Sequence, residues 1–160
     1  MDLANETTKT DYKTEIEKNG VIGFVPGGIS MWPILKNRGQ SVVVKKKTER
    51  LKRFDVAFYQ RTNGAFVLHR VMATTDEGYI MCGDSQLFYE VVKEEQVFGV
   101  MEGYYSGQNY IECSNPKYLL KVEKWYKRKF IRKFKLKIFY FIQKVKNRLK
   151  RIFKKSGVQK

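Results

Sequence analysis

Between Val21 and Ile111 the chain alternates short apolar runs with turn-forming residues. Asn63-Gly64 separates two of these runs, and Asn-Gly is the strongest short-range signal for a β-hairpin. Short runs at close spacing are typical of strands in a small antiparallel sheet. We therefore expect a mainly β body that is small and barrel-like. The expected strands cover residues 21–25, 41–44, 56–59, 65–68, 78–82, 97–101, 104–105 and 109–111.

Positive charge is concentrated in the last part of the 160-residue chain, whose formal net charge is +16. Residues 1–116 hold 14 Lys and Arg against 15 Asp and Glu, whereas residues 117–155 hold 17 Lys and Arg against the single acid Glu123. A chain of this length is expected to form one domain with an appendage. The expected segments are a polar stretch at 1–20, a β domain at 21–115, a basic amphipathic helix at 116–155 and a tail at 156–160.

The first twenty residues are polar and charged, without the apolar core of a signal peptide or a membrane span. Residues 10–18 are expected to form a short helix that ends at Asn19-Gly20. The two cysteines, Cys82 and Cys113, do not make a disulfide framework; unpaired thiols are expected, with pairing as the alternative. Because the chain has one histidine and two distant cysteines, we expect no zinc site and no cofactor.

A serine lies in the turn-forming stretch Gly27-Gly28-Ile29-Ser30-Met31-Trp32-Pro33. Glycine permits backbone conformations closed to other residues, and proline fixes its own φ. Such a turn can hold the Ser30 hydroxyl and its backbone N–H at an exposed junction, as a nucleophile and an oxyanion donor require. Clusters of this composition are mostly simple turns, so the assignment depends on two further segments.

The only histidine, His69, lies in an apolar run, and Asp84 follows in the turn Gly83-Asp84. An imidazole, with its unperturbed pKa of about 6.5, can take the proton of a serine hydroxyl. A carboxylate can then hold the ring tautomer and stabilise the imidazolium that forms. By composition alone, such a histidine is more often a packed or surface residue, and such an aspartate is more often a turn former.

Three motifs occur in the order nucleophile, base, orienter: the Ser30-Met31-x-Pro33 box, His69-Arg70-Val71, and Gly83-Asp84. This arrangement resembles the S24/S26 serine peptidases, in particular the signal peptidase I branch whose general base is histidine. The resemblance covers roughly residues 20–104 and implies the coiled all-β fold of that family. It also implies a serine endopeptidase that cleaves a leader or signal-like peptide after small residues, with Ser30, His69 and Asp84 as catalytic residues.

The resemblance implies further roles next to the serine. The Ser30 N–H is the expected oxyanion donor, and Ile29 and Met31 are the expected substrate-binding neighbours. Many bacterial relatives carry a hydroxyl two residues before the nucleophile, where this chain has Gly28. A weaker oxyanion hole, or a second backbone donor, is therefore expected.

Other polar residues near the motifs are expected to support the site. Asp55 is expected to be a turn and hydrogen-bond residue, and Arg70 to support the fold. Histidine-type relatives usually carry further aspartates after the Gly-Asp turn, whereas this chain offers Glu90. The acidic partner of His69 is thus Asp84, Glu90 or both. The alternative to an enzyme is an inactive descendant that keeps the fold as a peptide-binding or membrane-associated interaction module.

After Pro116, apolar residues recur in steps of three or four, and nearly every other position is Lys or Arg. This pattern predicts an amphipathic helix without the roughly twenty apolar residues of a membrane span. We expect residues 117–155 to lie on an anionic membrane surface, on the cytoplasmic side. One alternative is that the apolar residues of this helix pack on the β body. Another is that its positive charge binds nucleic acid, but the row of apolar residues argues against that. The row comprises Leu119, Val122, Tyr126, Phe130, Phe134, Ile138, Phe141, Val145, Leu149 and Ile152.

Overall fold

The computed structural model describes residues 12–36 and 39–155. The chain divides into two compact units, Met1–Leu119 and Leu120–Lys160. The first unit contains one helix, α1, eight strands and a short 3-10 helix, η1. In chain order its elements are α1 (Tyr12–Asn19), β1 (Val21–Phe24), β2 (Val42–Lys46), β3 (Val56–Gln60), β4 (Phe66–Thr75), β5 (Gly78–Cys82), β6 (Glu90–Lys93), η1 (Glu94–Gln96), β7 (Val97–Ser106) and β8 (Asn109–Glu112).

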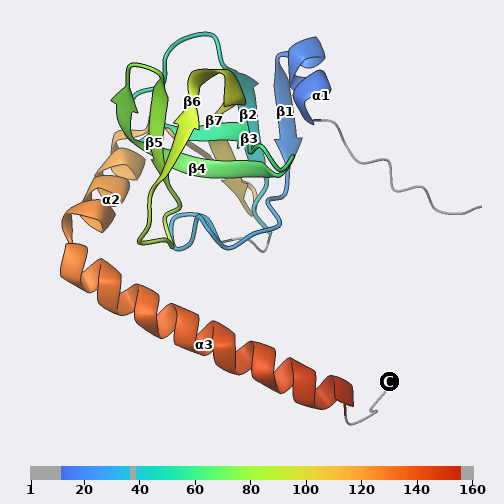
Figure 1. Cartoon of the computed structure of the whole chain (residues 1–160), viewed down its shortest axis with the longest axis vertical. Helices are drawn as coiled ribbons and strands as arrows, with labels where there is room; N and C mark the ends of the chain where they lie inside the picture. Colours follow the sequence, from blue (N-terminus) through green and yellow to red (C-terminus); the bar gives the residue numbers. More distant parts are fainter. Residues whose placement is uncertain (1–11, 37–38, 156–160) are drawn as a thin grey trace, which may run out of the picture. The chain divides into compact units, whose positions relative to one another are not determined.

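The eight strands form one antiparallel sheet in the order β1-β2-β7-β3-β4-β5-β6, and β8 pairs with β7. Figure 1 shows that β3 and β4 run across the direction of β1 and β2, so the sheet is strongly coiled. Register shifts at Val43/Val44, Phe58/Tyr59 and Val71/Ala73 interrupt the ladders, and such irregularities increase local bending and twist. The expected mainly β fold is therefore confirmed at this level.

The β3–β4 hairpin forms where Asn63-Gly64 predicts it. Gly64 has a φ of +81°, which glycine adopts without strain, and the Arg61 N–H donates to the Ala65 carbonyl at 2.9 Å. Both strands are longer than predicted, and β4 continues to Thr75. The hairpin matters for the site because it carries Tyr59 and His69 on its paired strands and Arg61 at the start of its turn.

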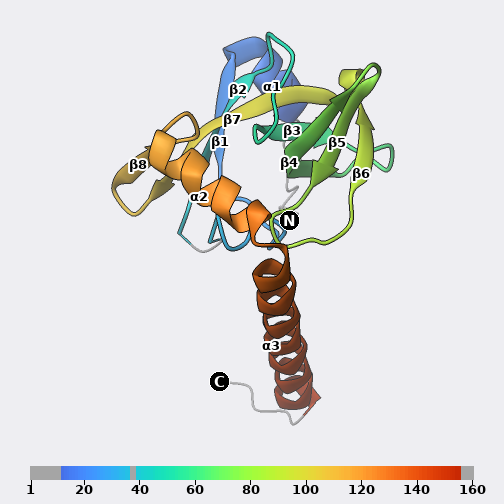
Figure 2. The same cartoon turned by 90° about the vertical axis from the view of Figure 1, so that its left-hand side faces the viewer.

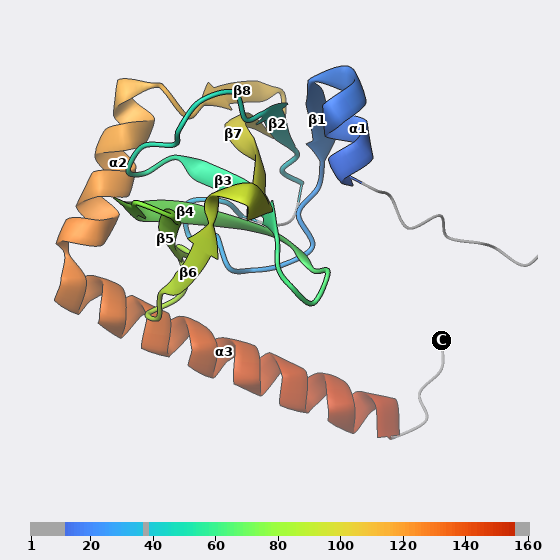
Figure 3. The ribbon, with the colours of Figure 1, turned by 45° about the horizontal axis from the view of Figure 1, so that its top comes forward.

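Several predicted elements match the structure closely. Strand β5 has the predicted bounds, and α1 covers the described part of the predicted N-terminal helix, of which residues 10–11 lie outside the described chain. The expected strands at 97–101 and 104–105 are one continuous strand, β7, which crosses the first unit between β2 and β3 (Figure 2). Strand β6 is not predicted by the apolar pattern; it lies beside β5 at the end of the sheet (Figure 3).

Two groups of side chains make up much of the interior of the first unit. One is an apolar cluster on one side of the sheet: Leu51, Ala57, Tyr59, Val71, Tyr79, Met81, Val92 and Val97. The other is a set of rings in edge or tilted contact, with centroids 4.9 to 5.8 Å apart: Tyr12, Phe24, Phe58, Phe66 and Phe98. Strands β3 and β4 contribute to both groups and are therefore held firmly.

The C-terminal segment forms two helices, α2 (Pro116–Lys127) and α3 (Lys129–Lys155), so the prediction of one helix over 116–155 is wrong. Helix α2 begins at a proline, and the Asn115 side chain accepts the Lys117 N–H at 2.9 Å, which satisfies a free donor of the first turn. The apolar period runs on across Arg128, which explains why the pattern does not reveal the break. In the described part of the chain no helix is both long and apolar enough to cross a membrane.

Candidate active site

Ser30 lies in a loop that leaves β1 and is anchored immediately after the serine. The Trp32 N–H donates to the Ile29 carbonyl at 3.1 Å, and the Leu35 N–H donates to the Met31 carbonyl at 2.9 Å. Met31 and Leu35 are buried, whereas the Ser30 side chain is partly exposed. The apolar residues that follow the serine thus fix the turn, and they leave the hydroxyl at the surface of a pocket.

His69 is carried by β4, opposite Ala57 of β3, and its side chain is only 2% exposed. Its Nδ1 atom lies 2.6 Å from Oε1 of Glu90 and 3.1 Å from the Tyr59 hydroxyl. An ionised carboxylate can only accept hydrogen bonds, so Nδ1 carries the proton and Nε2 keeps its lone pair. This is the tautomer that a general base acting through Nε2 requires.

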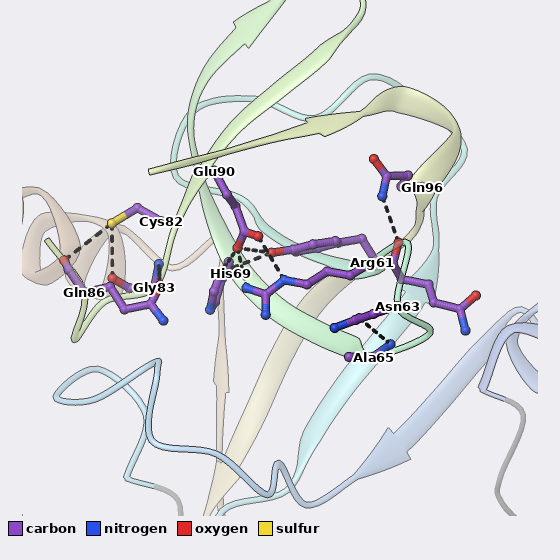
Figure 4. A network of polar contacts seen from close by, with 11 residues as sticks. Arg61, Asn63, Ala65, His69, Cys82, Gly83, Gln86, Glu90 and Gln96 are labelled. Carbon is purple, nitrogen blue, oxygen red and sulfur yellow. Dashed lines mark hydrogen bonds and ion pairs between the residues drawn. The ribbon is translucent and has the colours of Figure 1, made fainter. Parts of the chain in front are cut away.

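Glu90, the first residue of β6, is held by three side chains. The Arg61 guanidinium donates to both carboxylate oxygens at 2.9 Å, and the Tyr59 hydroxyl donates to Oε1 at 2.5 Å. Figure 4 shows the Glu90 carboxylate in contact with both the His69 ring and the Arg61 side chain. A bidentate guanidinium fixes the plane of a carboxylate, so the position of the oxygen that meets His69 is also fixed.

The electrostatics of this network favour a neutral ring beside an ionised carboxylate. Burial lowers the pKa of His69, although the negative charge of Glu90 opposes that shift. Burial acts to raise the pKa of Glu90, but hydrogen bonds from Arg61 and Tyr59 and the proximity of His69 outweigh it and lower the pKa. The pKa of Tyr59 is raised, mainly by burial and then by its hydrogen bond to Glu90, so this hydroxyl remains a donor. At neutral pH His69 is therefore ready to accept a proton.

Of the two acids expected beside His69, Glu90 contacts the ring and Asp84 contacts Arg70. Both of its oxygens accept from Arg70, at 2.8 Å from Nε and 2.7 Å from Nη2, and both side chains are completely buried. Adjacent residues of a strand point to opposite faces of the sheet. Because His69 and Arg70 are adjacent in β4, a carboxylate that meets Arg70 lies across the sheet from the imidazole.

Arg70 organises the buried face of the site. Its guanidinium also donates to the Phe54 carbonyl at 2.8 Å and to the Tyr118 hydroxyl at 3.2 Å. Phe54 has a φ of +78°, which is uncommon for a residue other than glycine, and its N–H donates to the Val71 carbonyl. Arg70 thus stabilises a strained turn, in keeping with the supporting role expected of it.

The Asp84 loop is joined to the serine loop by the backbone. The Ser85 N–H donates to the Ser30 carbonyl at 2.8 Å. A Cβ added to Gly83 would lie 2.8 Å from the same carbonyl oxygen, so only glycine permits this approach. Asp84 therefore acts on the serine indirectly, through the position of its loop.

Ser30 and His69 line one pocket of about 380 Å³. Across the described residues, no hydrogen bond joins the Ser30 hydroxyl to the His69 ring; the shared pocket is what brings the two together. Catalytic hydrogen bonds are often long before substrate binds and shorten in the complex. Met31 also lines this pocket, whereas Ile29 is exposed and is not part of its wall.

The remaining expected residues have structural contacts. The Asp55 carboxylate accepts the Lys52 N–H at 2.7 Å, and the Asp55 carbonyl accepts the Val71 N–H at 2.8 Å, as expected of a turn residue. Burial raises the pKa of Asp55, a shift opposed by that hydrogen bond. No disulfide joins the two described cysteines, Cys82 and Cys113. In the part of the chain that the structure covers, no three His, Cys, Asp or Glu side chains gather in a group able to hold a metal ion.

Tyr59 and Arg61 are the site residues that the sequence motifs miss. Tyr59 lies in β3 on the face of His69, and Arg61, just after the strand ends at Gln60, reaches the same place through Glu90. The two residues are two positions apart beside the Asn-Gly turn, and this spacing is the sequence signal that could have placed them near each other.

No protein-family model matches this chain, and no curated protein matches it significantly.

Proposed function

We propose that this chain is a serine endopeptidase of the S24/S26 type, in which Ser30 is the nucleophile, His69 the general base and Glu90 the residue that orients the base. One observation carries the proposal. The protonated Nδ1 of His69 is held by Glu90, and the ring shares a pocket with Ser30. A neutral imidazole in that tautomer is the group that a serine nucleophile needs.

The reaction would follow the chemistry of acyl transfer. Nε2 of His69 accepts the Ser30 proton as Oγ bonds to the scissile carbonyl carbon, and Glu90 stabilises the imidazolium. The developing oxyanion accepts a hydrogen bond from the Ser30 N–H, which donates to no other group among the described residues. The imidazolium then protonates the leaving amine as the C–N bond breaks. A water molecule, deprotonated by the same nitrogen, hydrolyses the acyl-enzyme.

The family assignment rests on the motifs and on their setting. The order of Ser30 and His69, the strand position of the histidine and a coiled antiparallel sheet all agree with an S24/S26 peptidase. If the likeness extends to specificity, the substrate is a leader or signal-like peptide with small residues before the cut. We further propose that the enzyme works peripherally at the cytoplasmic side of a membrane, held there by residues 117–155.

The inactive interaction module is the second candidate function, and two observations favour it. No hydrogen bond joins the Ser30 hydroxyl to His69 in the described structure, and Gly28 provides no side-chain donor for an oxyanion. Such a protein would bind peptides in the same pocket without cleaving them.

A fluorophosphonate probe distinguishes the two functions, because it phosphonylates only activated serines. Intact-mass and peptide spectra should place one adduct on Ser30 of the full-length protein. Ser30→Ala should abolish the adduct, and His69→Ala should slow its formation by roughly 10²–10⁴-fold. Ser114→Ala, which changes a serine away from the pocket, is the matched control. A Ser30 that does not react, or that reacts equally in His69→Ala, would overturn the peptidase and favour the interaction module.

A further inference from the structure

Helix α3 presents a continuous apolar face to solvent. Six residues of the predicted apolar row lie on α3 and recur in steps of three or four. From here on, the apolar stripe means these six: Phe130, Phe134, Ile138, Phe141, Val145 and Leu149. All six are exposed, Phe130 to 90%, Phe141 to 67% and Phe134 to 65%. Isolated exposed apolar residues are ordinary, but a contiguous face of this size marks an interaction surface.

The charge around the stripe is of one sign. The sequence of α3 holds twelve Lys and Arg and no acid. The nearest acid in the sequence, Glu123 of α2, pairs with Lys127 at 2.8 Å. Lys133, Lys137 and Lys144 on the polar side are exposed. A surface that covers this helix must therefore be apolar along one line and negatively charged on both sides of it.

Two residues of α3 away from the stripe have a different environment. Arg132 and Leu136 are buried, and the Arg132 guanidinium lies 4.5 Å from the centre of the Tyr126 ring. In the α2 part of the predicted apolar pattern, Val122 and Tyr126 are buried as well. Leu119 and Leu120 of α2 are exposed as well, but the continuous exposed row in steps of three or four lies on α3, from Phe130 onward.

We propose that α3 binds an anionic phospholipid bilayer, lying in the plane of the interface with the apolar stripe in the acyl region and its Lys and Arg side chains among the headgroups. This deepens, and rests on, the peripheral placement in the proposed function. At about 1.5 Å per residue the helix is about 40 Å long, so one molecule contacts many lipids. Helices with a strongly basic face and an aromatic or aliphatic face bind membranes in this way.

A bilayer fits this helix better than a nucleic acid does. Phosphate groups would satisfy the basic residues equally well, but a nucleic-acid backbone offers no apolar layer for Phe134, Ile138 and Phe141. A lipid interface accommodates both properties at once, because the anionic headgroups lie directly above the acyl chains. The absence of acid from the α3 sequence fits a negatively charged surface of either kind, so the stripe is the deciding feature.

The test is cosedimentation of the full-length protein with vesicles of phosphatidylcholine, and with vesicles in which a third of that lipid is phosphatidylglycerol. Binding should be at least about tenfold stronger to the anionic vesicles and should weaken with salt. Phe134→Ser should weaken it roughly tenfold, because a large apolar side chain leaves the acyl region. Tyr140→Ser is the matched control, an exposed aromatic of α3 outside the stripe, and should bind nearly as the wild type does.

Charge and nucleic acid are tested in the same series. Lys133→Gln/Lys137→Gln/Lys144→Gln should lose a hundredfold or more on anionic vesicles, since each surface charge contributes about a factor of five. Equal binding to both vesicle types, or no binding, would overturn the proposal. So would tighter binding to duplex DNA that Phe134→Ser leaves unchanged. Labelling of Ser30 by fluorophosphonate in the same samples reports the peptidase separately, so failure of one proposal is distinguished from failure of the other.

Discussion

The backbone N–H of Ser85 donates a 2.8 Å hydrogen bond to the carbonyl of Ser30. Through this bond the loop that carries Asp84 is tied to the loop that carries the candidate nucleophile. Asp84 is itself tied to Arg70, the residue after His69. A buried ion pair on one face of the sheet thus sets the position of a serine that faces a pocket with the histidine.

Asp84→Asn should destabilise the fold with little effect on the base. It leaves the Arg70 charge buried and poorly paired, and breaking such a pair costs about 3–5 kcal/mol. Urea denaturation should show that loss in the free energy of unfolding. In the protein that remains folded, the pH dependence of fluorophosphonate labelling should shift only slightly, since the Asp84 charge is a minor influence on the pKa of His69. A pH profile shifted as strongly as in Glu90→Gln would mean that Asp84 acts on the ring after all.

Unlike Asp84→Asn, Glu90→Gln should act mainly on the reaction and cause a large loss in the rate of Ser30 labelling. The amide no longer stabilises the imidazolium and no longer enforces the tautomer, so labelling should slow by roughly 10²–10⁴-fold. Since the Glu90 charge raises the pKa of His69, its removal should also move the acid limb of the labelling profile to lower pH. Glu95→Gln, a change at an exposed carboxylate of η1, is the control and should label normally. A normal rate in Glu90→Gln would contradict the assigned role.

Stability should decrease as the pH falls below about 6.5. The pKa of His69 is lowered in the folded state from its ordinary value of 6.5, so in that window the unfolded chain binds more protons than the folded one. The pKa of Glu90 is lowered in the folded state from 4.5, so its protonation causes a second loss of stability as the pH falls below about 4.5. Urea midpoints measured from pH 7.5 to 4 should show both losses. His69→Gln should remove the first, and an unchanged slope in that variant would refute its origin in His69.

Gly83→Ala should displace the serine loop. The new methyl would lie 2.8 Å from both the Ser30 carbonyl oxygen and Gln86 Oε1, which is closer than real Cβ contacts allow. Labelling should fall at least roughly tenfold, because small displacements of a nucleophile are costly to reactivity. Gly27→Ala is the control, since a Cβ there meets no atom within 4 Å. Equal rates in the two variants would show that the 83–85 loop does not position Ser30.

Gly28→Ser should increase the rate of labelling. A Cβ at Gly28 meets nothing within 4 Å, and its φ is not in the left-handed region, so the backbone accepts a side chain. A hydroxyl two residues before the nucleophile would supply a second oxyanion donor, and one such donor is worth up to roughly 10²–10³-fold. Gly28→Ala controls for the loss of glycine. If serine and alanine behave alike at this position, the oxyanion does not lie where the S24/S26 likeness places it.

The strands were predictable where apolar runs ended in turn residues, as at Gly78–Cys82 and around Asn63-Gly64. Strand β6 was missed because it has four residues, with a charge at each end and only one buried side chain, Val92. The break between α2 and α3 was missed because the apolar period continues through Arg128. These elements depend on tertiary contacts more than on local pattern.

The sequence singles out Ser30 and His69 because each stands in a short motif, whereas Glu90, the carboxylate that contacts His69, is only one of two acids it offers. Asp84 was preferred to Glu90 because it follows a glycine turn in the expected order along the chain. Which acid contacts His69 depends on the faces of β4: Glu90 lies on the face of His69, and Asp84 lies on the face of Arg70. Because His69 and Arg70 are adjacent in β4, they point to opposite faces and meet different carboxylates. Tyr59 and Arg61 stand in no motif, so their contacts with Glu90 appear only in the structure.

His69 and Arg70 are adjacent in β4 and have different partners on opposite faces of the sheet, so both contacts depend on the register between β4 and β3. Were β4 to pair with β3 one residue out of place, His69 and Arg70 would exchange faces of the sheet. Asp84 would then be enclosed without a cation, a penalty large enough to make the misaligned chain rare. Correct pairing of β4 with β3 is thus a precondition for the contact between His69 and Glu90, so molecules that complete folding are also those in which this contact has formed.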